Sequence, residues 1–492
     1  MSYYIGADLG TSALKLLLVE SDGKIIDTVT CEYPVFYPNP GWSEQHPEDW
    51  WTAFKKGINE LIKNVPVDEI KGIGFGGQMH GLVILDENDN VIRPAILWND
   101  GRTDKETDYL NCVVGKETLS ELTANIAFAG FTAPKLLWLK ANEPESFNKI
   151  KKIMLPKDYL NYKLTGIHCT DYSDASGFLL LDVKNKCWSR KMLEICSVTE
   201  EQMPTLFESY SPLGSIIPEI AEELGLSKNT IVVAGAGDNA AAAVGTGTVS
   251  DGRCNISIGT SGTIFISSDV FSVDSFNALH SFCHADGGYH LMGCILSAAS
   301  CNKWLCDDIL KATDYETEQQ PITDDKLGNN HVYFLPYLMG ERSPINDTDA
   351  RGTFTGMRLD TKREDILQAV LEGVAFAIRD NLEIAKASGI DIKSSSLCGG
   401  GAKSPLWQKI FCNVLNIPIT IPQTEQGPGY GGAMLAMVGA KEFGSVKDCA
   451  DKFVQIKEII NPTPEIAQRY EIQYSKFKKI YPQMKNIFKD IK

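Results

Sequence analysis

Apolar and polar positions along this chain follow two periods, one typical of strands and one typical of helices. Short β-branched or apolar runs predict strands at residues 3–7, 14–20, 70–75, 83–85, 231–233, 255–258, 263–267 and 396–398. Apolar residues at helical spacing predict helices at residues 50–63, 134–140, 363–385, 405–416 and 431–439, of which 363–385 is long and amphipathic. Because strands and helices alternate, we expect a layered α/β protein.

Two of these strand pairs are joined by turns of the same kind. The first pair uses Gly10-Thr11-Ser12, and the second, at residues 255–267, uses Gly259-Thr260-Ser261-Gly262. The two hairpins lie about half a chain apart, which suggests a duplicated architecture.

The chain is long enough for two domains, each with its own core, at 492 residues. A stretch rich in glycine and threonine, residues 245–251, precedes the second hairpin. We therefore expect one domain at residues 1–246 and a second at residues 247–492.

Composition excludes some classes of binding partner and indicates the cellular compartment. A net charge of −16 argues against nucleic acid and anionic membranes as partners. The first residues do not resemble a signal peptide, and no apolar run approaches the length of a membrane span. The thirteen cysteines include no C-x-x-C pair, so reduced thiols in the cytoplasm are the expected state.

Asp238 is the candidate general base of this chain. It follows the run 231–233 and alternating glycines, at the start of an alanine-rich helix in the string AGAGDNAAAAV. Ligands of open α/β sheets bind at such a strand end, where a carboxylate can accept a proton from an incoming hydroxyl. The structural alternative is that Asp238 only caps the helix, a position that aspartate favours.

Residues 235–240 also fit G-x-G-x-x-A, the dinucleotide-binding fingerprint. That motif calls for an acidic residue at the end of the next strand, but strand 255–258 runs into Gly259 without one. Asp238 would also face a pyrophosphate of like charge. We therefore do not favour a dehydrogenase.

Glycine-rich turns follow further strands, at Gly76-Gly77 and at Gly399-Gly400-Gly401. Glycine lets backbone N–H groups approach an anion closely, and threonine and serine add hydroxyl donors. Two G-T-S turns could bind one triphosphate from two sides, although each turn alone is more typical of a β-hairpin. The chain contains no Walker A motif.

Asp8 immediately precedes the first of these turns. One interpretation is an Asx-turn. The other is an anchor for Mg²⁺ through water, because Mg²⁺ keeps several waters and takes few carboxylates. Asp8 and Asp238 are thus two carboxylates at strand ends, one suited to hold metal and one to act as the base.

Short strings in a characteristic order carry a resemblance to a known family. They are DLGTS at Asp8, WSEQHPEDWW at Trp42, GQMHG at Gly77, PAILWNDGR at Pro94, GFTAPKLLW at Gly130, LPKDYL at Leu155, GDNAAAAVG at Gly237, IGTSG at Ile258, LPYLMGERSP at Leu335 and GGGAKS at Gly399. From Tyr4 to about Gly439 the chain resembles the FGGY carbohydrate kinases. The resemblance implies an α/β fold of two actin-like (ribonuclease-H-like) ATPase domains, with ATP and sugar in the cleft between them.

The same resemblance implies the site residues. Asp238 matches the catalytic base, and we expect Asp8 and Asp238 to be the metal-binding carboxylates. The expected sugar-binding residues are Met79, His80, Asp238 and Asn239. The expected ATP-binding residues are Asp8, Thr11, Ser12, Gly259, Thr260, Gly400, Gly401 and Ser404. One departure is the pair Gly431-Gly432, where alanine is usual in the family, and we expect no consequence for the chemistry.

The activity implied is ATP- and Mg²⁺-dependent phosphorylation of D-xylulose at its C5 hydroxyl. Ribulose, gluconate or glycerol are alternative substrates, and a sugar-free, actin-like ATP-binding module is the alternative from another class. Homodimers are common in the family, so a homodimer is possible here.

Two assignments stay open on the sequence alone. His80 lies near a strand end, where histidines more often make structural hydrogen bonds than take part in catalysis. Trp98, Asp100 and Arg102 could line the sugar side, or could form an internal ion pair with an aromatic lid.

Overall fold

The computed structural model describes residues 2–423 and 427–491, and its framework is a pair of seven-stranded sheets, one in each half of the chain. The first sheet has the order β13-β14-β5-β1-β2-β3, with β15 also paired to β5. Its strands are β1 (Tyr3–Leu9), β2 (Ala13–Glu20), β3 (Ile25–Glu32), β5 (Ile70–Gly77), β13 (Pro212–Ser215), β14 (Ile231–Val233) and β15 (Ala236–Gly237). Since β1, β14 and β15 all run parallel to β5, their carboxyl ends meet at one edge.

The second sheet has the order β18-β19-β17-β16-β22-β23-β24. Its strands are β16 (Arg253–Ile258), β17 (Gly262–Ser268), β18 (His280–Cys283), β19 (Tyr289–Ile295), β22 (Ser394–Cys398), β23 (Ile419–Pro422) and β24 (Ile456–Ile460). In both sheets an antiparallel meander of three strands is followed by strands parallel to its first one. The duplication expected from the two hairpins is therefore confirmed, and the boundary at residues 245–251 stays a prediction.

Asp8 lies inside β1, which ends at Leu9, two residues beyond the strand end predicted from the sequence. It is paired with Lys15 of β2 on one side and with Gly76 of β5 on the other. The Asx-turn interpretation of Asp8 is therefore wrong, because its backbone belongs to the ladder and the turn begins only at Gly10.

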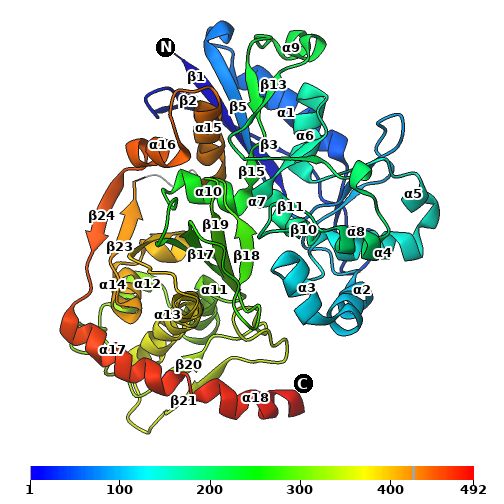
Figure 1. Ribbon diagram of the computed structural model, residues 1–492. Helices are drawn as coiled ribbons and strands as arrows, with labels where there is room; N and C mark the ends of the chain where they lie inside the picture. The colour runs from blue at the N-terminus through cyan, green and yellow to red at the C-terminus, as the bar shows by residue number, and fades with distance from the viewer. Residues whose placement is uncertain (1, 424–426, 492) are drawn as a thin grey trace.

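Helices cover both faces of the first sheet. On one face α1 (Pro47–Leu61) packs with alternate residues of β2, among them Leu16 and Leu18. On the other face lies α15 (Gly427–Gly439), which shares a cluster with Leu17 and Val19. Figure 1 shows α15, in the orange of the C-terminal part, beside the blue strands of the N-terminal half.

Glycines allow α15 to lie unusually close to its neighbours. A Cβ on Gly6 would lie 1.9 Å from the carbonyl oxygen of Gly429, and a Cβ on Gly431 would lie 1.9 Å from that of Ala241. The second contact is with α10 (Asp238–Gly245), the helix that begins at Asp238. Gly431 thus has a packing role in this chain.

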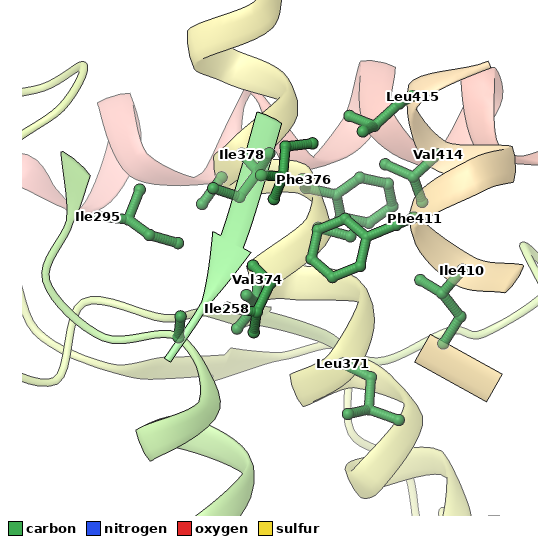
Figure 2. Packing of buried hydrophobic residues seen from close by; sticks show 14 of the residues in the cluster. Ile258, Ile295, Leu371, Val374, Phe376, Ile378, Ile410, Phe411, Val414 and Leu415 are labelled. Carbon is green, nitrogen blue, oxygen red and sulfur yellow. The ribbon is translucent and has the colours of Figure 1, made fainter. Parts of the chain in front are cut away.

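The centre of the second half is α13 (Arg363–Ala387), the long helix predicted at residues 363–385. The expected amphipathic pattern is wrong for its middle, because every residue from Leu367 to Arg379 is buried. The second sheet covers one side, and β20 (Tyr333–Leu335) and α14 (Pro405–Leu415) cover others. Figure 2 shows Phe376 of α13 against Phe411 of α14 in this core.

The remaining elements extend the two halves. Between β5 and β13 lie β6 (Val83–Leu85), β7 (Ala95–Ile96), α2 (Asp104–Asp108), α3 (Lys116–Thr123), α4 (Thr132–Asn142), α5 (Pro144–Asn148), β8 (Lys152–Met154), α6 (Pro156–Thr165), β9 (Cys169–Asp171), α7 (Tyr172–Ala175), α8 (Arg190–Cys196) and β12 (Thr205–Phe207). Other helices are α9 (Pro218–Leu224), α11 (Ala299–Lys303), α12 (Tyr315–Gln319), α16 (Val446–Phe453), α17 (Pro464–Phe477) and α18 (Ile480–Asp490).

Within the described residues, no helix has the length and apolar character needed to cross a membrane. None of the thirteen cysteines, all of which lie in the described residues, forms a disulfide.

We predict that Gly6→Ala strongly destabilises the protein, because the added methyl group would overlap the Gly429 carbonyl of α15. Overpacking of this kind typically costs about 1–3 kcal/mol or more. Urea unfolding curves would measure the loss. Gly101→Ala is the matched control, since its Cβ would meet nothing closer than 3.6 Å. Equal midpoints for the two variants would contradict a tight contact between β1 and α15.

Candidate active site

Asp8 and Asp238 lie at the same edge of the first sheet. Asp8 of β1 and Ala236 of β15 are both paired with Gly76, from opposite sides of β5. Adjacent strands are about 4.8 Å apart, so the two outer strands bracket β5 closely. Asp238 then opens α10 immediately after β15. The parallel register therefore brings together two carboxylates that are far apart in the sequence.

Asp238 does not cap its helix in the usual manner. The N-cap residue of α10 is Gly237, and no side chain makes a capping hydrogen bond there. Asp238 Oδ1 accepts hydrogen bonds from the backbone N–H of Asn239, at 2.7 Å, and from its Nδ2, at 2.9 Å. No described residue bonds Oδ2, which leaves that oxygen available to a ligand.

The electrostatic setting of the two carboxylates favours the protonated form of each. Burial, and then the charge of Asp8, raise the pKa of Asp238 to about 7. Burial also raises the pKa of Asp8 to about 6, against an opposing effect of Lys15. A carboxylate with a pKa near neutrality is well matched to accept a proton as a general base.

The four predicted sugar-binding residues line one cavity. Met79, His80, Asp238 and Asn239 surround a space of about 210 Å³. Its other walls are Trp98, Phe128, Gly130, Phe131, Ser261, Thr263, Met292, Cys294 and Arg342. The cavity therefore has aromatic side chains, one carboxylate and one guanidinium, a mixture suited to a small polyhydroxylated ligand.

His80 has both a structural role and a place in this cavity. Its Nδ1 lies 2.9 Å from the carbonyl oxygen of Gly177, and because a carbonyl only accepts, Nδ1 carries the hydrogen. Its backbone has a φ of 67°, and its carbonyl accepts from Lys135 Nζ and Thr132 Oγ1. Burial lowers the pKa of His80 to about 3, so the ring is neutral with Nε2 as an acceptor.

Trp98 and the pair Asp100–Arg102 have different roles. Trp98 lines the cavity, and its indole N–H donates to Thr11 Oγ1 at 3.0 Å. Arg102 is buried between Asp100 and Glu44, and its guanidinium lies 3.7 Å from the ring centroid of Trp42. The structure thus places Asp100 and Arg102 in an internal ion network and Trp98 in the wall of the cavity, next to the first G-T-S turn.

A larger cavity of about 770 Å³ lies on the second half and contains predicted ATP-binding residues. Thr260, Gly400, Gly401 and Ser404 line it, together with Ala299, Ser300, Asn302, Lys303, Asp314, Tyr315, Glu316, Gln319, Lys403, Pro405 and Trp407. Gly400 is open, since a Cβ there would meet nothing within 4 Å. Ser404 also caps α14, because its Oγ accepts the N–H of Trp407 at 3.1 Å.

The second G-T-S turn lies between the two cavities. Thr260 lines the larger cavity, and its neighbour Ser261 lines the smaller one. A third space of about 290 Å³ adjoins the smaller cavity at Asn239 and Thr263 and reaches Gly399, the residue before Gly400. A ligand in the larger cavity can therefore extend past this turn toward Asp238.

The predicted ATP-binding residues of the first half lie at the turn between β1 and β2. Thr11 and Ser12 are in this turn, and Asp8 is near the end of β1. The Gly10 N–H donates to the Ala13 carbonyl at 3.0 Å, which closes the turn, and the Thr11 carbonyl accepts from Gln45 Nε2 at 2.6 Å. Ser12 is exposed. The turn is thus held from behind while its outer side stays open to a ligand.

The carboxylate pair fits Mg²⁺ better than it fits a transition metal. Among residues 2–423 and 427–491, no group of three or more histidine, cysteine, aspartate or glutamate side chains is placed to hold a metal. Mg²⁺ is commonly held by one or two carboxylates plus substrate phosphates and water. Asp8 and Asp238 would supply those carboxylates at the sheet edge where β1 and β15 end beside β5.

Sequence reasoning missed several cavity residues. Phe128 and Met292 gave no recognisable signal, and neither did Tyr315 and Gln319 of α12. Phe131 lies within GFTAPKLLW, a string that carried the resemblance without a role for the phenylalanine. Arg342 lies within LPYLMGERSP, a string that carried the resemblance without a role for the arginine. In the structure its guanidinium lies 5.3 Å from the Phe128 ring centroid.

Comparison with known proteins agrees with this geometry. The chain matches the FGGY family of carbohydrate kinases, N-terminal domain, over residues 3–245 and the C-terminal domain of the same family over residues 254–440. The chain belongs to the FGGY family of carbohydrate kinases.

Particular relatives narrow the class. The xylulose kinase of Escherichia coli (strain K12) is 38% identical, covering 98% of this chain and 99% of the relative. A crystal structure described as a xyloylose kinase from Brucella ovis is 39% identical, with a TM-score of 0.92 over 99% of this chain and 100% of that one. Gluconate kinase from Lactobacillus acidophilus is 25% identical, with a TM-score of 0.93 over 100% of both chains.

We predict that Asp238→Asn makes the ligand-free protein more stable, and increasingly so as the pH rises. The pKa of Asp238 is about 7 in the fold, above an unfolded value of about 3.9. The folded state therefore holds the extra proton, and its stability falls as pH rises between these values. Melting temperatures of both proteins at about pH 5 and about pH 8, with a chelator, would measure this. A difference that does not change with pH would contradict the raised pKa.

Proposed function

We propose that this chain transfers the γ-phosphoryl group of ATP to D-xylulose, giving D-xylulose 5-phosphate. The observation that carries the proposal is the position of Asp238 in a small cavity, separated from a larger one by a G-T-S turn. The xylulose kinase relatives, at 38% and 39% identity, support this substrate over gluconate, whose kinase is 25% identical.

In this proposal Asp238 is the general base. Its Oδ2 accepts the proton of the C5 hydroxyl, while Asn239 holds Oδ1. Met79, His80 and Asn239 hold the sugar, and Nε2 of the neutral His80 accepts a hydrogen bond from a sugar hydroxyl. The hydroxyl oxygen then attacks the γ-phosphorus of ATP. The bond between the γ-phosphorus and the β,γ-bridging oxygen breaks, and that oxygen leaves with ADP. Catalysis of phosphoryl transfer is mostly positioning and charge stabilisation, so few covalent roles are needed.

The nucleotide would occupy the larger cavity, with its phosphates at the two turns. Thr11 and Ser12 would contact the phosphates from the first half, and Gly259 and Thr260 from the second. Gly400, Gly401 and Ser404 would line the adenosine side. Mg²⁺, held by Asp8 and Asp238, would supply neutralisation of the phosphate charge. ATP as substrate and the absence of disulfides among the described cysteines support the cytoplasm as the compartment. A homodimer stays a prediction.

Arg342 is the reason to keep gluconate as the second candidate. Among the described residues no carboxylate forms an ion pair with its guanidinium, although it lines the sugar cavity. A cation of this kind suits a ligand carboxylate. The fold alone does not separate the two substrates, because the gluconate kinase structure superimposes with a TM-score of 0.93.

We predict that ADP release depends on a sugar and is largest with D-xylulose. A base in a cavity apart from the nucleotide has nothing to deprotonate productively until a hydroxyl is bound. A coupled ADP-release assay with xylulose, ribulose, gluconate, glycerol and no sugar would measure the preference. Strongest stimulation by gluconate would favour the second candidate. Equal release with and without every sugar would mean a sugar-free ATP-binding module.

We predict that Asp238→Asn lowers kcat by about 10²–10⁴-fold, the usual cost of losing a general base. An amide keeps the size of the side chain but cannot accept the proton, so the KM values should change much less. Asp27→Asn, at an exposed carboxylate of β3, is the control and should keep normal turnover. A folded Asp238→Asn protein with near-normal kcat would remove Asp238 from the mechanism.

A further inference from the structure

Behind the sugar cavity lies a fully buried cluster of four charged side chains. Lys157 Nζ is 2.6 Å from Asp158 Oδ1, 2.9 Å from Asp171 Oδ1 and 3.4 Å from Asp174 Oδ2. All four side chains have 0% exposure, and neither oxygen of Asp174 has a hydrogen-bond partner. The cluster brings together α6, β9 and α7 through a single ammonium group.

Stability alone is a weak explanation for this cluster. Removing charged groups from water costs several kcal/mol per ion, and apolar residues of similar volume often serve as well or better. Three carboxylates around one ammonium also leave negative charge uncompensated. What the cluster provides instead is a fixed position for the segment from Asp171 to Gly177, which comprises α7 and the turn after it.

That segment makes hydrogen bonds to Gly237, which precedes Asp238, and to the side chain of His80. Ser173 Oγ accepts the N–H of Gly237, the residue before Asp238, at 3.1 Å. Four residues further on, the carbonyl of Gly177 accepts from His80 Nδ1 at 2.9 Å. Ser173 Oγ in turn donates to Asp171 Oδ2 at 2.5 Å, so this contact is tied directly to the charged cluster.

The same segment also reaches the second half of the chain. Ser176 Oγ accepts the N–H of Cys283, in β18, at 3.0 Å. Lys157 itself lies behind β5, where a Cβ on Gly77 would be 2.7 Å from its Cβ. The segment therefore contacts His80, the strand β15 that leads to Asp238, and the second sheet, while Lys157 contacts the strand that leads to Met79 and His80.

We propose that Lys157 and Ser173 are positioning residues for the phosphoryl transfer, because they fix the segment 171–177 that holds Gly237 and thereby aims Asp238. The proposal rests on the function proposed above. Its physical basis is that a displacement of about 1 Å at a catalytic group can cost about 10²-fold in rate. Ser173 is the direct link, since its hydroxyl joins the charged cluster to the backbone that precedes the base.

Two serines allow a matched test. Ser173 and Ser209 both donate to Asp171 Oδ2, at 2.5 Å and 2.7 Å, and both are buried. Only Ser173 also accepts from Gly237. Ser173→Ala and Ser209→Ala thus each remove one hydroxyl hydrogen bond to Asp171 Oδ2. The difference in kcat between the two variants therefore isolates the contact of Ser173 with Gly237, which leads to Asp238.

We expect kcat for D-xylulose to fall about 10- to 100-fold more in Ser173→Ala than in Ser209→Ala. The KM for ATP should be unchanged and the melting temperatures of the two variants similar. Equal kcat values, or a loss that appears only as a lower melting temperature, would overturn the proposal. Failure of the wild-type protein to phosphorylate D-xylulose would instead contradict the proposed function.

A second variant keeps the test valid if Ser173→Ala does not fold. Ser173→Cys nearly preserves the side-chain volume but offers a sulfur, a weak donor and acceptor. We expect a folded protein with a kcat between those of the wild type and of a variant without the contact, and an unchanged KM for ATP. Wild-type kcat in a folded Ser173→Cys protein would also overturn the proposal.

Discussion

The close approach of α15 to the first sheet is the constraint on which the rest of the arrangement depends. The helix lies against β1, β5 and α10 with backbone almost touching backbone, as at Gly6 with Gly429 and at Gly431 with Ala241. Dispersion contacts are individually small, but such a tight fit permits only one relative position. Because α10 begins at Asp238, that position also fixes where the carboxylate emerges from the sheet edge.

Much of the fold could be predicted, because the two G-T-S hairpins and the strands around them have clear local patterns. β1, β2, β16 and β17 were found within a few residues of their ends. The burial of α13 could not be predicted, since it depends on elements that approach it from all sides and not on its own period. For the same reason the sequence did not show that Asp8 belongs to the strand rather than to the turn.

Some residues of the candidate site could also be predicted from the sequence, and others could not. Met79, His80, Asp238 and Asn239 could be named because strings of recognisable sequence contain them, and they do line one cavity. Trp98 and Arg102 were ambiguous, because adjacent residues of one string point to different environments in the fold. Ser173 gave no signal, and Lys157 lies in LPKDYL, a string that carried the resemblance without a role for the lysine. Their contacts join α6, α7 and β15 and exist only after the chain has folded.

The position of α15 also bears on how the chain is made. The strands of the first sheet and α10 leave the ribosome long before α15 and α16, which complete the apolar cluster on one face of that sheet. Until Gly439 has been synthesised, Leu17, Val19 and the alanines of α10 lack the α15 residues that pack on them, and exposed apolar surface of this kind invites aggregation. During translation the N-terminal half therefore carries a part of its core that only the C-terminal part of the chain can cover.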